Sequence, residues 1–337
     1  MEKDRKLDHI QLAFDSHTGM LEQDRRFIYE PMLAAHPEEK AQPFLFLGKM
    51  VRAPFWVSSM TGGTGVAEKI NKNIARACRE FGFGMGLGSC RKILFDKTHW
   101  ADFDMRDTIG PDQPFWANLG IAQVEKLLKE RNEKAMIDLV GGLRADGLVV
   151  HVNPLQEWFQ PEGDHIEQPP IETIEHLMSR IHLPIIVKEV GQGMGPASLK
   201  RLLKLPLAAI EFAAFGGTNF SKLELMRENP AVQEMYEPFA FVGQTAHQMV
   251  KSVNLLLQEV EEPQCRQLII SGGIKNYLDG YHLVSLSQLP AIYGMASSVL
   301  KHATGDYHEL KTYVGNQLKA YRLAQQFLTI NPDYDSA

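Results

Sequence analysis

The chain has 337 residues, of which 44% are hydrophobic and 23% are charged, and its formal net charge is -6. This composition is typical of a globular protein with a large core, and the mildly acidic charge argues against nucleic acid or a membrane surface as a general partner. The three cysteines are widely spaced, and no apolar run is long enough to cross a bilayer. We therefore expect a reduced, cytoplasmic protein.

The first fifty residues are polar and interrupted, and they differ from the rest of the chain. We expect residues 1–50 to form an N-terminal extension that packs on the remainder or on a neighbouring subunit. The extension begins with the charged segment Arg5-Lys6-Leu7-Asp8-His9, for which spacing alone favours a solvated helix start. Residues 51–337 contain no repeat, low-complexity tract or linker, so they are predicted to be a single domain.

From residue 55 onward, apolar segments alternate with amphipathic ones. The predicted strands are residues 55–60, 83–87, 115–120, 147–152, 184–190, 208–212, 267–270 and 291–296. The predicted helices are residues 66–81, 123–135, 196–203, 245–260 and 310–328, and residues 216–244 are predicted to be a long, mobile connection.

Eight strand–helix alternations in a chain of this length predict a (β/α)8 barrel, the TIM barrel, preceded by the N-terminal extension. A doubly wound open sheet is the alternative. It would concentrate polar and glycine-rich segments at one switch point, whereas here they follow nearly every strand. The barrel is therefore favoured.

Polar side chains gather where the fourth predicted strand ends. His151 and Asn153 share one face of this strand, and Pro154 should end it because proline cannot donate to a ladder. The next turn carries the amide Gln156 and the carboxylate Glu157. Ligands bind at the carboxyl ends of strands in α/β proteins, so we expect these groups to form part of a site. Satisfied caps of a strand end are the alternative.

Three glycine-bearing turns occur after or at the end of the last three predicted strands, at Gly216-Gly217-Thr218, Gly272-Gly273-Ile274 and Gly294-Met295-Ala296. Glycine lets backbone N–H groups approach an oxyanion closely, and barrels usually bind phosphate after the seventh and eighth strands. We therefore predict a phosphate site there. Each glycine pair taken singly is also explained by an ordinary turn.

Lys188 lies inside a predicted buried strand, where an unpaired ammonium is costly. It therefore needs an anion, a cofactor or its neighbour Glu189 as a structural partner. Ser89 and Asn118 are neutral hydrogen-bonding groups at strand ends, and they suit the edge of a polar ring. The sequence has no His-Glu-x-x-His metal motif, no Gly-x-Ser-x-Gly nucleophile elbow and no lysine-bearing phosphate loop.

Seven motifs, taken in chain order, resemble those of type 2 isopentenyl-diphosphate isomerases. They are Arg5-Lys6-x-Asp8-His9, Ser59-Met60-Thr61-Gly62-Gly63, Gly88-Ser89-Cys90-Arg91, His151-x-Asn153-Pro154-Leu155-Gln156-Glu157, Val187-Lys188-Glu189-Val190-Gly191, Gly216-Gly217-Thr218-Asn219-Phe220 and Ser271-Gly272-Gly273-Ile274. The resemblance runs to about Ala296. The stretch through Gln156-Glu157 is specific to this family, whereas the lysine strand and the Gly-Gly-Ile turn are shared with other FMN-dependent barrels and discriminate less.

The resemblance implies an FMN-containing TIM barrel that interconverts isopentenyl and dimethylallyl diphosphate by a 1,3-allylic proton shift, in isoprenoid biosynthesis. Reduced flavin is the implied acid and base, Mg2+ the implied metal and NADPH the implied reductant. The implied oligomer is a homo-tetramer or homo-octamer, in which the charged N-terminal arm completes a neighbour's site.

The resemblance also assigns residues to roles. The implied FMN-binding residues are Ser59, Met60, Thr61, Ser89, Asn118, Lys188, Thr218, Gly272, Gly273, Met295 and Ala296. The implied residues around the prenyl diphosphate substrate are Arg5, Lys6, Ser89, Arg91, His151, Asn153 and Gln156. Glu157 is implied to bind Mg2+ on the diphosphate. Gln156, His151 and Lys188 are implied to be catalytic, and Gln156 would orient rather than protonate, because an amide does not titrate.

Two departures from the family pattern affect the expected cofactor site. Ala213-Ala214-Phe215 replaces a Ser-Gly-Arg-like run, which removes a hydroxyl and a cation near the expected FMN phosphate. Cys90 replaces the more usual glutamine. Two other functions stay open at this point. One is an FMN-dependent oxidoreductase of the hydroxy-acid or inosinate-dehydrogenase type, for which no histidine base or mobile cysteine loop is evident, and the other is a non-catalytic flavin- or phosphate-binding protein.

Overall fold

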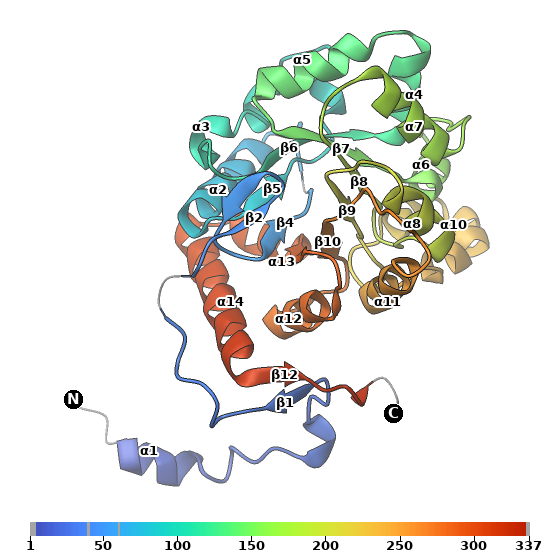
Figure 1. Ribbon diagram of the computed structural model, residues 1–337. Helices are drawn as coiled ribbons and strands as arrows, with labels where there is room; N and C mark the ends of the chain where they lie inside the picture. The colour runs from blue at the N-terminus through green and yellow to red at the C-terminus, as the bar shows by residue number, and fades with distance from the viewer. Residues whose placement is uncertain (1–4, 39–40, 60, 335–337) are drawn as a thin grey trace.

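The structure, a computed structural model, describes residues 5–38, 41–59 and 61–334. Eight strands form a closed barrel in the spatial order β10-β11-β4-β5-β6-β7-β8-β9 (Figure 1). Every neighbouring pair is parallel. The (β/α)8 prediction is confirmed, and the open sheet is wrong because the strand order closes on itself.

All eight barrel strands lie at their predicted positions. They are β4 (Phe55–Val57), β5 (Gly84–Gly86), β6 (Phe115–Gly120), β7 (Gly147–His151), β8 (Ile185–Lys188), β9 (Ala209–Glu211), β10 (Leu268–Ser271) and β11 (Ala291–Met295). Most are shorter than predicted, because the polar and glycine residues at their carboxyl ends leave the ladder to form loops. Those loops line the site described below.

Helices surround the barrel (Figure 1). They are α2 (Ala67–Phe81), α3 (Arg106–Ile109), α4 (Ile121–Lys129), α5 (Glu133–Leu143), α6 (Pro154–Phe159), α7 (Pro170–Arg180), α8 (Pro196–Leu203), α9 (Phe220–Leu225), α10 (Pro230–Tyr236), α11 (Ala246–Leu256), α12 (Tyr277–Leu286), α13 (Ser297–Ala303) and α14 (Tyr307–Phe327). In the described residues, no helix is both long and apolar enough to cross a membrane.

Two helix predictions need correction. The single helix expected at residues 123–135 is interrupted between α4 and α5, where Arg131 has a left-handed backbone with φ of 54°. The connection at residues 216–244 contains α9, α10 and a short 3-10 helix, η4 (Glu237–Phe241). Asn219 and Asn229 cap α9 and α10 by accepting hydrogen bonds from backbone N–H groups, which stabilises the first turn of each helix and marks where it begins.

Interior side chains of the barrel lie in two layers of opposite character. The first is apolar and consists of Trp56, Trp116, Val149, Ile186, Ala209, Ile269 and Ile292. Residues two positions further along a strand face the same side, and here six of those seven positions are polar, the exception being Gly294. The polar residues are Ser58, Asn118, His151, Lys188, Glu211 and Ser271. The polar layer therefore lies nearer the carboxyl ends of the strands.

A hairpin closes the amino end of the barrel. It consists of β2 (Phe44–Phe46) and β3 (Lys49–Val51), which are antiparallel. Phe46 and Val51 are buried against the apolar layer. The backbone N–H of Leu47 donates to the side chain of Gln267 at 2.9 Å, just before β10 begins.

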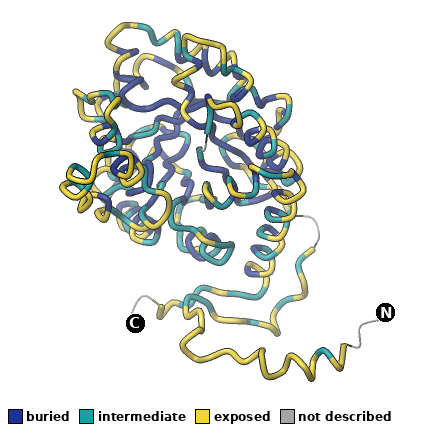
Figure 2. Tube along the Cα trace, turned by 180° about the vertical axis from the view of Figure 1, so that it is seen from behind, coloured by how far each residue is buried: buried dark blue, intermediate teal, exposed yellow. Residues whose placement is uncertain are grey.

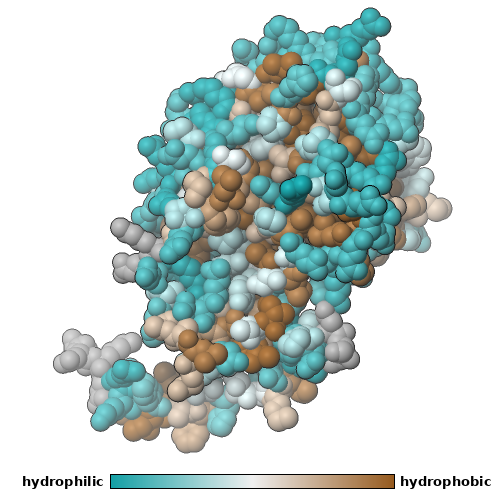
Figure 3. All heavy atoms as spheres, in the orientation of Figure 1, coloured by the Kyte–Doolittle hydropathy of each residue, from teal (hydrophilic) through white to brown (hydrophobic). Residues whose placement is uncertain are grey.

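Residues 5–38 form an arm outside the barrel. Its strand β1 (Phe27–Tyr29) pairs antiparallel with β12 (Leu328–Ile330) at the other end of the chain. Helix α1 (Arg5–Leu12) buries no residue and lies apart from the barrel in both ribbon and tube views (Figures 1 and 2). Hydrophobic side chains are at the surface of this arm (Figure 3), among them Leu7, Ile10, Phe14, Met20, Leu21, Met32 and Leu33.

Candidate active site

Two adjoining cavities lie at the carboxyl end of the barrel. One of about 370 Å³ lies among the loops after β9, β10 and β11, and its lining includes Thr218, Gly272, Gly273, Met295 and Ala296. The other, of about 270 Å³, is lined by residues that include Thr61, Ser89, Asn118, His151 and Gln156. Ser59 and Lys188 line both cavities. The structure thus brings together most of the site residues expected from the sequence.

A larger cavity, of about 930 Å³, lies between residues 41–44, the end of α2 and α14. It is next to the amino end of the barrel and contains none of the expected site residues. Size alone is therefore a poor guide here, and the chemistry of the lining identifies the pair of cavities at the carboxyl end.

Close backbone contacts build the wall of the 370 Å³ cavity. A Cβ atom on Gly272 would lie 2.2 Å from the backbone of Ala214, and Gly272 has a φ of 90°. Only glycine fits there. Ala214 is fully buried, so the departure from the family pattern at this position is compatible with the contact. The result is a wall made mostly of backbone, which a flat or anionic ligand can approach closely.

Lys275 is a cation that the sequence analysis did not assign. It lines the same cavity as Gly272 and Gly273, together with the hydroxyl-bearing Ser297 and Ser298. The sequence did contain a signal for Lys275, because this residue directly follows the Gly-Gly-Ile turn at the predicted phosphate site. Lys275 therefore restores a positive charge near the predicted phosphate site, where the family pattern would supply one from the segment now occupied by Ala213-Ala214-Phe215.

Lys188 is buried, and its ammonium donates to the backbone carbonyl of Glu189 at 2.8 Å. The carboxylate of Glu189 instead accepts the backbone N–H groups of Gly191, Gln192 and Gly193 at 2.6, 2.6 and 2.9 Å. Burial raises the pKa of Glu189, although these bonds oppose the shift. The structural Lys188–Glu189 ion pair considered from the sequence is thus replaced by a carbonyl contact, which leaves other donors of Lys188 available to the cavities.

The His151 ring is fixed by an amide. Its Nδ1 lies 2.9 Å from Oδ1 of Asn118, and Nδ2 of Asn118 donates to the carbonyl of Leu87 at 2.9 Å. Because the amide oxygen is the acceptor, Nδ1 carries the proton and Nε2 is the free acceptor. Burial, reinforced by the charge of Lys188, lowers the pKa of His151 from 6.5 to about 3. His151 is therefore neutral near pH 7.

Gln156 is held from two sides at the start of α6. Nδ2 of Asn153 donates to Oε1 of Gln156 at 3.0 Å, and Nε2 of Gln156 donates to Glu224 at 3.1 Å. Glu224 is buried on α9, and Arg227 pairs with its other oxygen at 2.5 Å. Sequence reasoning missed Glu224 because it lies in the segment predicted to be a mobile connection. The only local signal for Glu224 was its spacing of four residues from Phe220, because residues at this spacing lie on the same face of a helix. Phe220 lines both cavities.

Glu157 and Asn153 support the site from behind and do not line either cavity. Both are buried, and Nδ2 of Asn153 donates to Oε1 of Glu157 at 3.0 Å. The other carboxylate oxygen of Glu157 accepts the backbone N–H of Asp164 at 2.8 Å. Among the residues that the structure describes, no group of three acidic, histidine or cysteine side chains is placed to hold a metal ion.

The remaining cations lie further out. Arg91 pairs with Asp164 at 3.0 Å and is half exposed. Arg5 and Lys6 are on α1, which Figures 1 and 2 show apart from the barrel, so the structure does not bring them to the cavities of the same chain. Met60, expected to contact FMN, lies outside the described residues.

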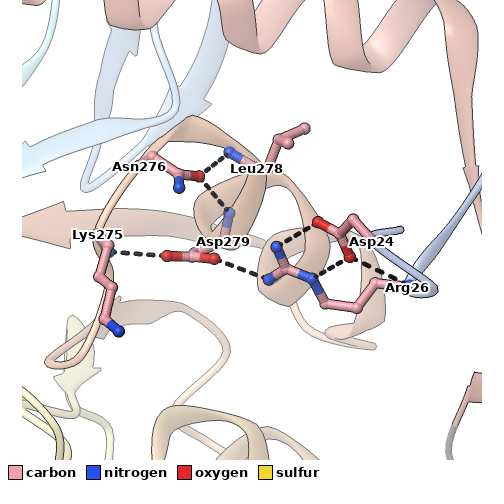
Figure 4. A network of polar contacts seen from close by, with 6 residues as sticks. All are labelled: Asp24, Arg26, Lys275, Asn276, Leu278 and Asp279. Carbon is pink, nitrogen blue, oxygen red and sulfur yellow. Dashed lines mark hydrogen bonds and ion pairs between the residues drawn. The ribbon is translucent and has the colours of Figure 1, made fainter. Parts of the chain in front are cut away.

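The arm is nevertheless tied to the loop that carries Lys275 (Figure 4). Arg26 donates from Nη1 to Asp279 of α12 at 2.8 Å, and it also pairs with Asp24 at 2.7 Å. The other oxygen of Asp279 accepts the backbone N–H of Lys275 at 2.8 Å, and Asn276 caps the helix between them. A chain of direct contacts therefore connects the arm to the edge of the 370 Å³ cavity.

No family model matches the chain. Among curated proteins, the isopentenyl-diphosphate delta-isomerase of Rickettsia typhi is 31% identical, over 89% of this chain and 86% of the relative. The protein of that name from Vibrio parahaemolyticus is 36% identical, over 77% of this chain and 74% of the relative. The protein of that name from Synechococcus sp. is 30% identical, over 98% of this chain and 93% of the relative.

Solved structures with the same fold are more distant in sequence. A mandelate oxidase mutant with the monooxide FMN adduct has a TM-score of 0.57 and 12% identity, covering 90% of this chain and 88% of that one. A flavocytochrome b2 mutant with sulfite bound has a TM-score of 0.60 and 14% identity, covering 89% and 72%. At this identity the likeness concerns the fold alone.

Proposed function

The chain belongs to the isopentenyl-diphosphate delta-isomerase family, and from this premise we propose that it interconverts isopentenyl and dimethylallyl diphosphate in isoprenoid biosynthesis. The reaction moves a proton from one end of an allylic unit to the other. The observation that carries the proposal is the convergence of Lys188, His151 and Gln156 on two adjoining cavities at the carboxyl end of the barrel. The bacterial relatives are consistent with the type 2, flavin-dependent class.

FMN fits the 370 Å³ cavity. The backbone wall at Gly272 and Gly273 admits a flat ligand, and Lys188 and Lys275 supply positive charge on its lining. The hydroxyl of Ser59 is buried and has no hydrogen-bond partner within the described part of the chain, so it is available to a ligand. Reduced FMN, when bound, supplies an acid–base group on its ring system. We propose that Ser59, Met60, Thr61, Ser89, Asn118, Thr218, Met295 and Ala296 complete the FMN site.

The diphosphate substrate is assigned to the 270 Å³ cavity, beside His151, Gln156 and Ser89. Neutral His151 attracts a polyanion only weakly, so most of the charge must come from elsewhere. Arg91 at the rim is one source, since guanidinium groups bind phosphate as planar forks. Asn153 and Glu224 hold Gln156 so that its amide presents one fixed orientation to the substrate.

Two apolar side chains border the proposed site of the alkene. Val190 and Phe220 line both cavities, next to Lys188. A dry, apolar surround prevents water from capturing a cationic transition state of the alkene. Gln156 does not titrate, so its role in this proposal is to orient the alkene.

We also propose that Glu157 binds Mg2+ together with the substrate diphosphate. Mg2+ is usually held by one or two carboxylates, with waters and phosphate oxygens as its other ligands. A single carboxylate such as Glu157 is consistent with that mode. Each oxygen of Glu157 accepts one hydrogen bond, from Asn153 or from the backbone of Asp164, which leaves a lone pair on each oxygen for a metal ion.

A homo-oligomer, a tetramer or an octamer, is part of the proposal. The arm exposes apolar side chains that a neighbouring copy would bury, and Arg5 and Lys6 of that copy would then add cations to the diphosphate site. Deleting residues 1–12 is expected to lower activity more than thermal stability. Unchanged turnover after this deletion would reduce Arg5 and Lys6 to a solvated segment.

NADPH, as the reductant of the flavin, and a cytoplasmic location complete the proposal. The location rests on the three cysteines, which are all buried and unpaired, as is usual in a reducing compartment.

One experiment tests the main proposal. The purified protein is examined for a flavin spectrum and then assayed with isopentenyl diphosphate, FMN, NADPH and Mg2+. We expect a yellow protein that forms dimethylallyl diphosphate without net oxidation of substrate. A yellow protein that oxidises a 2-hydroxy acid and shifts no double bond would instead support the oxidoreductase alternative.

A further inference from the structure

Glu211 is a carboxylate inside the barrel that the function described above does not use. It is 0% exposed and lies on β9 in the polar layer beneath the two cavities. Oε1 accepts a hydrogen bond from the hydroxyl of Ser271 at 3.2 Å. Oε2 accepts no well-formed hydrogen bond in the part of the chain that the structure describes, although the hydroxyl of Ser58 and the indole N–H of Trp56 lie near the carboxylate. A buried, half-satisfied carboxylate is costly for folding, so its presence calls for a functional explanation.

Lys188 is the neighbour of Glu211 across the strand pair. The two residues are in register in the β8–β9 ladder, and both side chains face the interior of the barrel. Burial raises the pKa of Glu211, whereas the charge of Lys188 and the nearby Ser58, Ser271 and Trp56 side chains lower it. The positive charge of Lys188 is thus the main influence that favours the ionised carboxylate.

The other carboxylate near Lys188 is already committed. Glu189 accepts three backbone N–H groups and gives Lys188 only its carbonyl. Gly294 completes the arrangement, because a Cβ atom there would lie 2.8 Å from Oγ of Ser58 and 2.9 Å from Cβ of Ser271. The absence of a side chain at Gly294 leaves Ser58 and Ser271 room beside Glu211.

We propose that Glu211 is a positioning residue that acts as the counter-ion of Lys188 and so sets how much positive charge Lys188 presents to a ligand in the cavities. That ligand is taken to be a flavin, and in this respect the proposal rests on the proposed function. A cation next to a flavin favours its anionic reduced form. Glu211 offsets part of this effect, and its removal makes the bound flavin easier to reduce.

The test measures the reduction potential of FMN bound to the full-length protein by equilibration with a redox dye. Glu211→Gln is expected to shift the potential to a more positive value, so that the ratio of reduced to oxidised flavin at fixed ambient potential rises about tenfold, which is about 30 mV for a two-electron couple. Glu211→Asp keeps the charge and is expected to stay close to the wild-type value.

Glu125→Gln is the matched control. Glu125 is a buried carboxylate, 5% exposed, on α4 outside the barrel wall, and it accepts backbone N–H groups from residues 167 and 168. Its removal is expected to leave the flavin potential unchanged. Ser271→Ala is the substitute variant if Glu211→Gln does not fold. Loss of the hydroxyl donor makes the ionised form of Glu211 less stable. We therefore expect the flavin potential to become more positive in this variant too, but by a smaller amount.

The outcomes separate the two proposals. Bound flavin with equal potentials in the wild type, Glu211→Gln and Ser271→Ala overturns the counter-ion role and leaves the isomerase proposal standing. A protein that binds no flavin overturns both. A positive shift in Glu211→Gln that is missing in Glu211→Asp and Glu125→Gln supports the assignment, since a merely structural role would not depend on charge.

Discussion

The two ends of the barrel use polar groups in opposite ways. At the amino end, Asp146 pairs with Lys49 at 2.7 Å and with Arg106 at 3.0 Å, and it accepts the backbone N–H of Phe115. At the carboxyl end, Oγ of Ser59 and Oε2 of Glu211 are buried and have no hydrogen-bond partner within the described residues. Paired groups stabilise a fold, whereas groups left with free hydrogen-bonding capacity are available to a ligand. Asp146 thus serves the stability of the fold at the amino end, whereas Ser59 and Glu211 keep hydrogen-bonding capacity at the carboxyl end.

The largest expected effect tests the amino end. Phe46→Ala removes a ring that is 1% exposed in the hairpin that closes the barrel. We expect the free energy of unfolding to fall by about 3–5 kcal/mol, as for other buried phenylalanines, while flavin affinity of the folded fraction is kept. Urea unfolding and a flavin titration measure the two quantities. Phe95→Ala, at a ring that is 74% exposed, is the control and should change neither.

The second effect concerns the carboxyl end. Glu157→Gln keeps the shape of the side chain but removes the charge that would hold Mg2+. We expect turnover to fall by about a hundredfold and the Mg2+ requirement to shift to higher concentration, while bound flavin and thermal stability stay close to wild type. Initial rates over a Mg2+ series measure this. Loss of flavin from the variant would count against a metal role for Glu157.

The third effect is a pH dependence of stability. The pKa of His151 is about 3 in the folded chain and near 6.5 when it unfolds, so the unfolded chain binds the extra proton between these values. Stability is therefore complete above pH 6.5 and is lost as pH falls toward 3. The wild-type protein loses part of its free energy of unfolding between pH 6.5 and pH 5, and we expect His151→Gln to make this loss smaller by up to about 2 kcal/mol. If the stability of the two proteins falls in parallel as the pH is lowered, His151 takes up its proton as readily in the folded chain as in the unfolded chain, and the prediction is wrong.

The smallest effect tests whether the arm matters to the carboxyl end. Arg26→Gln removes a partly exposed ion pair to Asp279, for which about 0.5–1 kcal/mol is expected. Hydrogen exchange should become faster at residues 24–30 and at the Lys275 amide, because Asp279 loses one of the contacts that position it. Arg25→Gln removes the same charge one residue earlier, without this ion pair. Equal exchange in both variants would mean that the arm and the loop are independent.

The parts of the fold that local signals determine were predictable. The strand at residues 115–120 and the helix at residues 196–203 agree with the structure at both ends, since a glycine ends the strand and a proline begins the helix. The break between α4 and α5 was not, because Arg131 adopts its left-handed backbone without a glycine or proline to mark it. The β1–β12 pair was also invisible, since two strands of three residues give no periodic pattern.

The candidate site follows the same division. Residues at strand ends, such as His151 and Lys188, were predictable because parallel strands in a barrel converge at one end. Glu224 was missed, because a helix that packs over the barrel from a long connection has its place fixed by tertiary contacts. Arg5 and Lys6 remain an expectation, because a single chain does not bring α1 to the cavities.

The pairing of β1 with β12 has a consequence for the order of events during translation. Residues 27–29 leave the ribosome early, yet their partner strand, residues 328–330, emerges nearly three hundred residues later. The eight barrel strands end at residue 295, so the barrel is synthesised completely before the arm gains its partner. β1 therefore has no partner strand through most of synthesis, and the β1–β12 pair can form only when the chain is almost complete.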